Sequence, residues 1–242
     1  MNKSKAIFCW SGGKDSAYCL HKVLQEENFD VKYLLTTING SFNRISMHGV
    51  REELLDKQSE SIGIPLLKVF VHEGSNAEYE KQMETALLKA KCEGIEHVIF
   101  GDIFLEDLRQ YRENNLAKVE MKGVFPLWKM DTAFLINDFI GQGFKTIVCC
   151  TNDGYLGEEW AGKEIDKNFI EQLPTNVDPC GENGEFHTFC FAGPIFKKEI
   201  LFEIGEKVYK QLEIKTNDCS LPSNIMTKGF WYCELLPAMT KC

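Results

Sequence analysis

The stretch Trp10-Ser11-Gly12-Gly13-Lys14-Asp15-Ser16 decides the fold of this 242-residue chain. An apolar run at residues 6–9 precedes it and has the length of a buried strand. Beyond it, apolar residues recur at helical spacing at Ala17, Leu20 and Val23. We therefore predict a strand–loop–helix unit, in which the two glycines allow a tight turn and a close approach of the backbone to a ligand.

The composition of the loop is typical of an anion site. N–H groups of the loop and of the first helical turn converge on an anion, and the helix dipole favours negative charge there. Asp15 would repel a phosphate, so its presence is explained by a Mg²⁺ ion carried on that phosphate. The plain alternative is a Gly-Ser turn capped by Asp15 or Ser16. The predicted phosphate contacts are Ser11, Gly12, Gly13, Lys14, Asp15 and Ser16, with Asp15 as the metal ligand.

The bulk composition excludes several classes of protein. With 44% hydrophobic and 26% charged residues, we expect a soluble globular protein. The net charge of −9 argues against direct binding of nucleic acid through bulk phosphate attraction. The sequence shows no signal peptide and no run of transmembrane length, so we expect a cytoplasmic protein without a membrane partner. The ten cysteines include no C-x-x-C pair, which disfavours zinc and thioredoxin-type sites and leaves a catalytic cysteine as a minor alternative.

The hydrophobic pattern predicts an α/β fold. Strands alternate with helices up to residue 127, which indicates a doubly wound parallel sheet with helices on both faces. The later predicted strands of this sheet are 33–38, 66–71, 98–100 and 124–127. The sequence beyond is richer in turns, and we predict a boundary near Trp128, between a ligand-binding domain at 1–127 and a smaller C-terminal α+β domain at 128–242. Ligands of such sheets bind beyond the carboxyl ends of the strands.

A second group of polar residues lies in the run 181–188, Gly-Glu-Asn-Gly-Glu-Phe-His-Thr. Its glycines free the backbone, so Glu182, Glu185 and His187 could be aimed at one point. In a strand, Glu185 and His187 would share a face. A carboxylate–imidazole pair suits proton removal from an amine nucleophile, or metal and ribose binding. The plain alternative is a hairpin loop with a solvated charged face, and the residues alone leave both open.

These motifs resemble those of the diphthine–ammonia ligase family, a branch of the N-type ATP pyrophosphatases. The loop at 10–16 is similar to their SGGKDS pyrophosphate loop, and residues 178–188 and 193–198 resemble the family's signature. Further similar pieces are Ser46-Met47-His48, Gly101-Asp102-Ile103, Pro126-Leu127-Trp128 and residues 157–162. The resemblance extends from residue 5 to about residue 200 in the family's order.

The resemblance implies a fold and a reaction. The fold is a HUP-like parallel sheet of order 3-2-1-4-5, which would place Gly101 and Asp102 beside Asp15; the alternative for Asp102 is a helix cap. The reaction is ATP-dependent amide formation: a carboxylate is adenylated with release of pyrophosphate, and ammonia then displaces AMP. The implied ligands are ATP and Mg²⁺. The implied catalytic residues are Lys14, Asp15, Glu182, Glu185 and His187, and the implied nucleotide contacts are residues 11–16, His48, Gly101 and Asp102.

The acceptor stays open at this point. The named family members act on diphthine, a modified histidine of translation elongation factor 2, and carry a Glu-Tyr-Gln-like stretch after the Gly-Asp-Ile motif. Residues 104–112 here, Phe-Leu-Glu-Asp-Leu-Arg-Gln-Tyr-Arg, resemble the bacterial branch instead, so the acceptor is diphthine or another carboxylate. The nitrogen source and the oligomeric state, a homo-oligomer included, are also open. The competing functions are another adenylating or sulfur-transfer enzyme of this superfamily and a non-catalytic ATP- or AMP-binding module.

Overall fold

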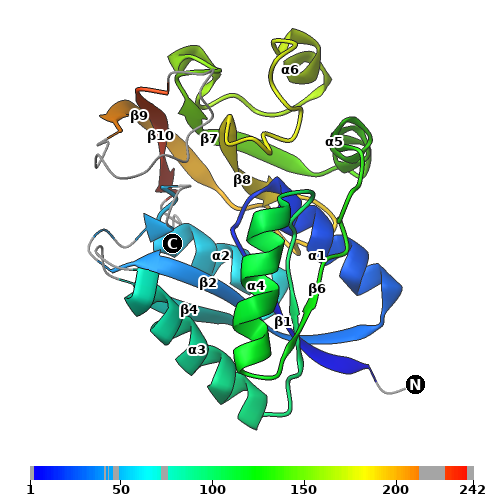
Figure 1. Ribbon diagram of the computed structural model, residues 1–242. Coiled ribbons are helices and arrows are strands. Elements are labelled where there is room, and N and C mark those ends of the chain that lie inside the picture. The colour runs from blue at the N-terminus through cyan, green and yellow to red at the C-terminus, as the bar shows by residue number, and fades with distance from the viewer. Residues whose placement is uncertain are drawn as a thin grey trace.

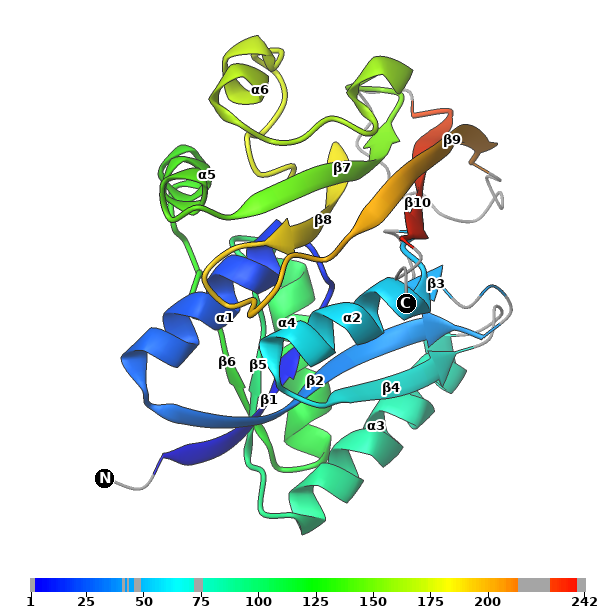
Figure 2. The ribbon, with the colours of Figure 1, turned by 180° about the vertical axis from the view of Figure 1, so that it is seen from behind.

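The computed structural model describes residues 3–40, 42, 44–45, 49–71, 76–212 and 227–238. The described chain forms two sheets, one stacked above the other (Figures 1 and 2). The first contains β1 (Ser4–Cys9), β2 (Phe29–Asn39), β3 (Arg44–Ile45), β4 (Leu66–Val71), β5 (His97–Ile99) and β6 (Lys122–Val124). The second contains β7 (Lys145–Asn152), β8 (Phe186–Ala192), β9 (Phe202–Gln211) and β10 (Gly229–Pro237). The helices are α1 (Lys14–Glu26), α2 (Glu52–Ile62), α3 (Asn76–Cys92), α4 (Glu106–Lys118), α5 (Thr132–Gly141), α6 (Lys167–Gln172) and a 3-10 turn, η1 (Glu158–Trp160).

The first sheet has the predicted topology. Its parallel strands follow the order β4-β2-β1-β5-β6, which is the expected 3-2-1-4-5, and the two-residue strand β3 adds an antiparallel pair to β2. The strand order reverses between β1 and β5. The carboxyl ends of these two strands, where ligands of such sheets bind, carry the glycine loop at 10–13 and the Gly101-Asp102 pair.

Helices cover both faces of this sheet, as the alternation along β1 requires. Ala6 and Phe8 join the hydrophobic cluster under α1 and α2, whereas Ile7 points to the opposite face and joins the cluster under α3 and α4. The doubly wound arrangement is therefore confirmed, with α1 and α2 on one side and α3 and α4 on the other (Figure 2).

The second sheet is antiparallel, in the order β8-β7-β10-β9, and belongs to the expected smaller α+β part. Two details differ from the sequence predictions. The strand expected at 124–127 is β6, which ends at Val124, because Pro126 has no N–H to donate and Trp128 N closes a turn onto Phe125 O at 3.1 Å. Strand β9 was not expected, since nearly all of its residues are exposed or half-exposed and its apolar residues do not alternate regularly.

The loop after β1 is held between the two sheets. Cys190 N in β8 donates a hydrogen bond to Gly12 O at 2.8 Å. The buried Gln58 amide of α2 donates from Nε2 to both Gly12 O, at 3.0 Å, and Cys190 O, at 2.6 Å. The position of the loop is thus fixed by contacts from both halves of the chain. Among the described residues, no helix is both long and apolar enough to cross a membrane.

Candidate active site

Gly12 shapes the loop at the carboxyl end of β1. Its φ of 77° lies in the left-handed region, and a Cβ there would come within 2.9 Å of Leu55 Cδ2 and of Gln58 Oε1. A side chain at this position would therefore be both strained and obstructed. The two loop hydroxyls bond within the loop: Ser11 Oγ donates to Ser16 Oγ at 3.1 Å, and Ser16 Oγ to the carbonyl of the preceding turn.

The N-terminus of α1 is open to an anion. Gly13 is its N-cap, and neither Asp15 nor Ser16 makes a capping hydrogen bond, so the predicted alternative of a turn capped by one of these two residues is wrong. Lys14 is buried, with 2% of its surface exposed, and its backbone N donates to Thr188 Oγ1 of β8 at 3.0 Å. The positive end of the α1 dipole points toward this loop, which favours an anion there.

The ammonium group of Lys14 is the positive centre of the site. Its Nζ donates to Asp15 Oδ2 at 2.8 Å and to the carbonyl of Cys180. Burial disfavours the charge, but Asp15, Cys180 and Glu182 favour it more strongly, so the pKa of Lys14 lies above its ordinary value. Lys14 therefore carries a charge in a nearly dry site, where its interaction with a phosphate is strong.

Asp15 and Asp102 meet where the strand order reverses. Gly101 lies so close to α1 that a Cβ there would be 3.2 Å from Asp15 O. Asp102 is paired with Arg112, whose Nε lies 2.6 Å from Asp102 Oδ2. Burial raises the pKa of Asp102, and Arg112 opposes the rise. The structure thus brings Gly101 and Asp102 to the glycine loop, as the resemblance implied. Asp102 does not cap α4, whose N-cap is Leu105.

Glu182 completes an acidic group around Lys14. Burial, followed by the charge of Asp15, raises the pKa of Glu182 to about 8; Lys14 opposes the rise and Asp102 adds to it. The charges of Asp15 and Asp102 thus both act on the Glu182 carboxyl group. Gly181, with a φ of 71°, makes the turn that directs Glu182 here. A buried carboxyl group whose pKa is raised by burial and by neighbouring charges is characteristic of a functional site.

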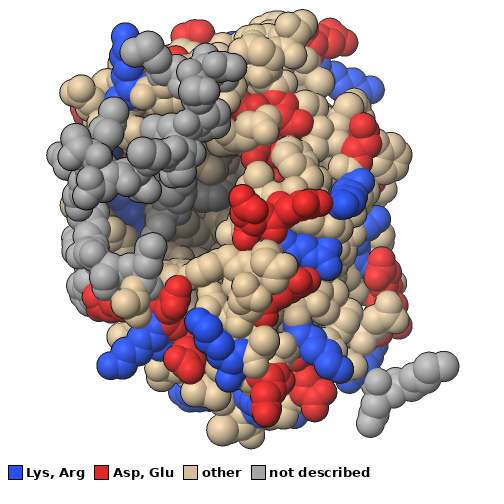
Figure 3. Space-filling model, in the orientation of Figure 1, with Lys and Arg blue, Asp and Glu red and all other residues tan. Residues whose placement is uncertain are grey.

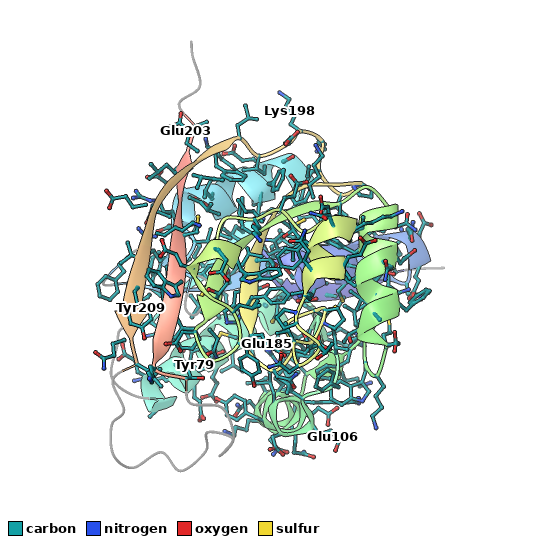
Figure 4. All side chains as sticks on the ribbon, turned by 90° about the horizontal axis from the view of Figure 1, so that it is seen from above. Tyr79, Glu106, Glu185, Lys198, Glu203 and Tyr209 are labelled. Atoms are coloured by element: carbon teal, nitrogen blue, oxygen red, sulfur yellow. The ribbon has the colours of Figure 1, made fainter. Side chains whose placement is uncertain are left out.

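Glu185 has a different position from the one expected. It is fully buried, and its carboxylate accepts hydrogen bonds from the backbone N of Asp178 at 2.9 Å and from the backbone N and Nδ2 of Asn183 at 2.8 and 2.9 Å. Figure 4 shows it in the interior of the molecule, whereas Lys198 and Glu203 lie at the rim. These contacts favour a role in holding the 178–185 loop over the proton-accepting role that the sequence suggested.

His187 lies in β8 between two residues that face the glycine loop. Thr188 bonds to the Lys14 backbone, and the ring of Phe186 lies 5.5 Å below Lys14 Nζ. Because side chains alternate along a strand, His187 points to the other face of β8. Glu185 precedes that strand. The expectation that Glu182, Glu185 and His187 converge on one point is therefore not met: Glu182 alone faces Asp15.

The site fits a magnesium ion that arrives with a nucleotide better than one held by protein alone. Within the described ranges, no three His, Cys, Asp or Glu side chains are arranged to hold a metal ion. Asp15 Oδ1, however, is buried and has no hydrogen-bond partner in the described part of the chain. Mg²⁺ commonly takes one or two carboxylates together with substrate phosphates and water, which is what Asp15 beside a phosphate site would offer. His48, another expected nucleotide contact, lies outside the described residues.

The site includes residues that sequence reasoning had given no role. Gln58 and Thr188 hold the glycine loop from α2 and β8, and Arg112 pairs with Asp102 from α4. Thr188 belongs to the quoted 181–188 run and Arg112 to the quoted 104–112 stretch, although neither residue was singled out. Nothing in the sequence pointed to Gln58, which reaches the loop from α2. The molecule is hollowed between the two sheets on the face that Figure 3 shows, with acidic side chains at the edge of the hollow.

Comparisons with known proteins identify the family of the chain. Residues 4–123 match the family model of the diphthamide synthase N-terminal domain, and residues 131–217 match that of the diphthamide synthase C-terminal domain. The chain belongs to the diphthamide synthase family. The predicted resemblance is thereby confirmed, and with it the prediction of an ATP-dependent ligase of this family.

Several relatives span the chain. It is similar to a diphthine–ammonia ligase of Danio rerio, 26% identical over 82% of this chain and 86% of the relative. The protein of the same name from Homo sapiens is 23% identical over 92% of this chain and 97% of its own. Among solved structures, the U34-tRNA thiolase NcsA from Methanococcus maripaludis matches over 58% of each chain, with 18% identity and a TM-score of 0.37.

Proposed function

We propose that this protein is a carboxylate–ammonia ligase that cleaves ATP to AMP and pyrophosphate, with diphthine on elongation factor 2 as its acceptor. The names of its relatives support the acceptor. The observation that carries the reaction type is the pair of buried Lys14 and half-buried Asp15, 2.8 Å apart at the N-terminus of α1, whose charges both act on Glu182. This arrangement offers a phosphate site, a carboxylate oxygen for magnesium and a base, which are the groups that such a reaction needs.

In the first step, the acceptor carboxylate oxygen attacks the α-phosphorus of ATP. The bond between this phosphorus and the bridging oxygen to the β-phosphorus breaks, and pyrophosphate leaves with that electron pair. Lys14 Nζ and the positive end of the α1 dipole stabilise the charge that develops on the leaving group. Asp15 Oδ1 would hold a magnesium ion, which would supply neutralisation of the phosphate charge.

In the second step, ammonia attacks the carbonyl carbon of the acyl adenylate. The bond from this carbon to the AMP oxygen breaks, and the nitrogen loses one proton as the amide forms. Glu182 takes this proton, because its pKa of about 8 lets it accept a proton and release it again near neutral pH. Glu185 fixes the loop that positions Glu182.

Thiol chemistry, the alternative enzyme class, has less support. Burial raises the pKa of Cys9, Cys180 and Cys190, the cysteines nearest the glycine loop. A buried thiol with a raised pKa is a poor nucleophile, since the thiolate is the reactive form. These contacts favour the ligase over a sulfur transferase that uses these residues.

The test is a product analysis with purified protein, Mg·ATP, ammonium and diphthine-bearing elongation factor 2. We expect AMP and pyrophosphate in a 1:1 ratio with amide, and no amide when ammonium is withheld. ADP as the main nucleotide product would overturn the proposed cleavage site. Nucleotide binding without any turnover would favour a non-catalytic module.

A further inference from the structure

A cavity of about 150 Å³ lies between α3 and α4, behind the acidic group of the site. Its walls are mainly apolar and aromatic, and include Tyr79, Met83, Phe100, Leu108 and Tyr111. A cavity of this volume accommodates a group of about six heavy atoms, the size of benzene. Of the residues named above for the candidate active site, only Arg112 lines this cavity.

Arg112 is the cationic group at the end of the cavity nearest to the glycine loop. Its guanidinium lies 4.3 Å from the Phe100 ring centroid, and its Nη2 donates to Asp102 Oδ1 at 3.0 Å. It also acts electrostatically on the thiol of Cys9, the last residue of β1 before the loop. Arg112 therefore stands between the cavity and the site of phosphate binding.

We propose that this cavity receives the acyl chain of the acceptor and that Arg112 binds its carboxylate. The inference rests on the proposed function and names the acceptor side of the same site. A nucleophilic carboxylate must approach an anionic triphosphate, so a cation is needed on its path. A guanidinium presents paired N–H donors that match the two oxygens of a carboxylate.

The present partner of Arg112 fits this role. The Asp102 carboxylate binds the Arg112 guanidinium in the geometry that an acceptor carboxylate would take. Burial raises the pKa of Asp102, so Asp102 takes up a proton more readily than an exposed aspartate when a second carboxylate shares Arg112. The apolar walls beyond Phe100 then surround the acyl chain and exclude water from the reacting carboxylate.

The test compares the KM for diphthine-bearing elongation factor 2 with the KM for ATP in amide formation. Arg112→Gln removes the paired donors, and we expect the acceptor KM to rise about 10- to 100-fold, the effect of losing charge-assisted hydrogen bonds. The KM for ATP should change less than about twofold, since Arg112 does not touch the glycine loop. Arg112→Lys keeps the charge but lacks the paired N–H donors, so its acceptor KM should lie between those of wild type and Arg112→Gln.

A second variant tests the cavity without touching Arg112 or Asp102. Met83→Trp fills the space between α3 and α4, and we expect it to raise the acceptor KM and leave the KM for ATP unchanged. Leu88→Trp is the matched control, because Leu88 lies on the same helix with 45% of its surface exposed, outside the cavity. Thermal unfolding of each variant shows whether it is folded.

The outcomes separate the inference from the function on which it rests. Amide formation by the wild type with an unchanged acceptor KM in folded Arg112→Gln and Met83→Trp overturns the inference and leaves the proposed function standing. A rise in the KM for ATP in Met83→Trp would make the cavity a nucleotide pocket and also overturn it. Absence of amide with the wild type overturns the proposed function itself.

Discussion

Lys14 is one of the residues that join the two halves of the molecule. Its backbone binds Thr188, and its ammonium binds Asp15 and the Cys180 carbonyl. The sequence predicted a cation at this position but not its three contacts, since two of them come from residues more than 160 positions away. A motif specifies which groups a ligand meets locally. The partners that hold those groups in place come from the tertiary fold.

Asp15→Ala tests the proposed magnesium contact. The substitution removes Oδ1, the buried oxygen without a partner, and should abolish Mg·ATP turnover while the fold persists. Asp15→Asn keeps the shape without the charge and serves as the control for packing. Circular dichroism checks the fold, and pyrophosphate release measures turnover. Undiminished ATP cleavage in folded Asp15→Ala would show that this carboxylate has no part in the reaction.

Glu182→Gln and Glu185→Gln should separate chemistry from scaffolding. Glu182→Gln removes the proposed base, so we expect ATP binding to persist and amide formation to fall about 10²- to 10⁴-fold. Glu185→Gln removes a buried carboxylate that accepts three hydrogen bonds, so we expect the free energy of unfolding to fall by about 2 kcal/mol. Urea unfolding and single-turnover amide formation measure the two effects. Normal stability of Glu185→Gln would contradict the loop-holding role.

The raised pKa of Glu182 also predicts a pH dependence of stability in the absence of nucleotide and magnesium. In the unfolded chain Glu182 ionises near its ordinary pKa of 4.5, whereas in the folded protein burial and Asp15 hold its pKa at about 8. Between these values the folded state binds more protons, so stability falls as pH rises. Wild type should therefore lose stability relative to Glu182→Gln between about pH 5 and 8. Urea unfolding at several pH values measures this difference, and a constant difference would refute the assignment.

Among the elements, β10 is tied to the first sheet by an ion-pair network. Glu234 lies 2.6 Å from Arg44 of β3 and 2.5 Å from Arg51, the N-cap of α2. Burial alone would raise the pKa of Glu234, but the two arginines outweigh it and lower the pKa below 4.5. The network joins the edge of the parallel sheet to the antiparallel one and so helps to fix the space between them.

Glu234→Gln should weaken this connection in a pH-dependent way. A lowered pKa contributes stability above the ordinary value of the group, and this contribution is lost as pH falls through the folded value. Because the three side chains are partly exposed, we expect a loss of about 1 kcal/mol near pH 7. The difference from wild type should shrink as pH falls through the lowered pKa of Glu234 in the folded protein, below which the group is protonated in both states. An equal difference at acid and neutral pH would point to packing instead of charge.

The elements themselves were largely predictable from the sequence. The parallel strands and their helices follow clear periodicities, and their order followed from the resemblance. The predictions failed where tertiary context decides: β6 ends before Pro126 because of a local turn, and β9 forms on a mostly exposed stretch because β10 pairs with it over nearly its full length. The position of His187 was missed for a related reason, since β8 begins at Phe186 and its alternation aims Thr188 at the loop.

At the scale of the whole molecule, the two halves share one hydrophobic core. A single cluster contains Phe8 and Tyr18 of the first half together with Phe139 and Phe186 of the second. Tyr18 Oη also donates to Asp138 at 2.5 Å, which joins α1 to α5. A domain that folds alone needs its own core. The predicted boundary near residue 128 therefore separates the two sheets. The cluster, however, contains residues from both sides of this boundary and is shared by them.

We therefore expect the chain to unfold as one unit, and the piece 1–127 not to fold cooperatively alone. Trp10 reports on the first half and Trp160 on the second, and both belong to the shared cluster. In variants that retain only one of these tryptophans, with the others replaced by Phe, the fluorescence transitions in urea should coincide. The isolated piece should show no sigmoidal transition, because its side of the cluster would be exposed to water. Two separate transitions, together with cooperative unfolding of the piece 1–127, would show that each half is stable independently. Contacts such as Tyr18–Asp138 would then hold together two halves that fold on their own.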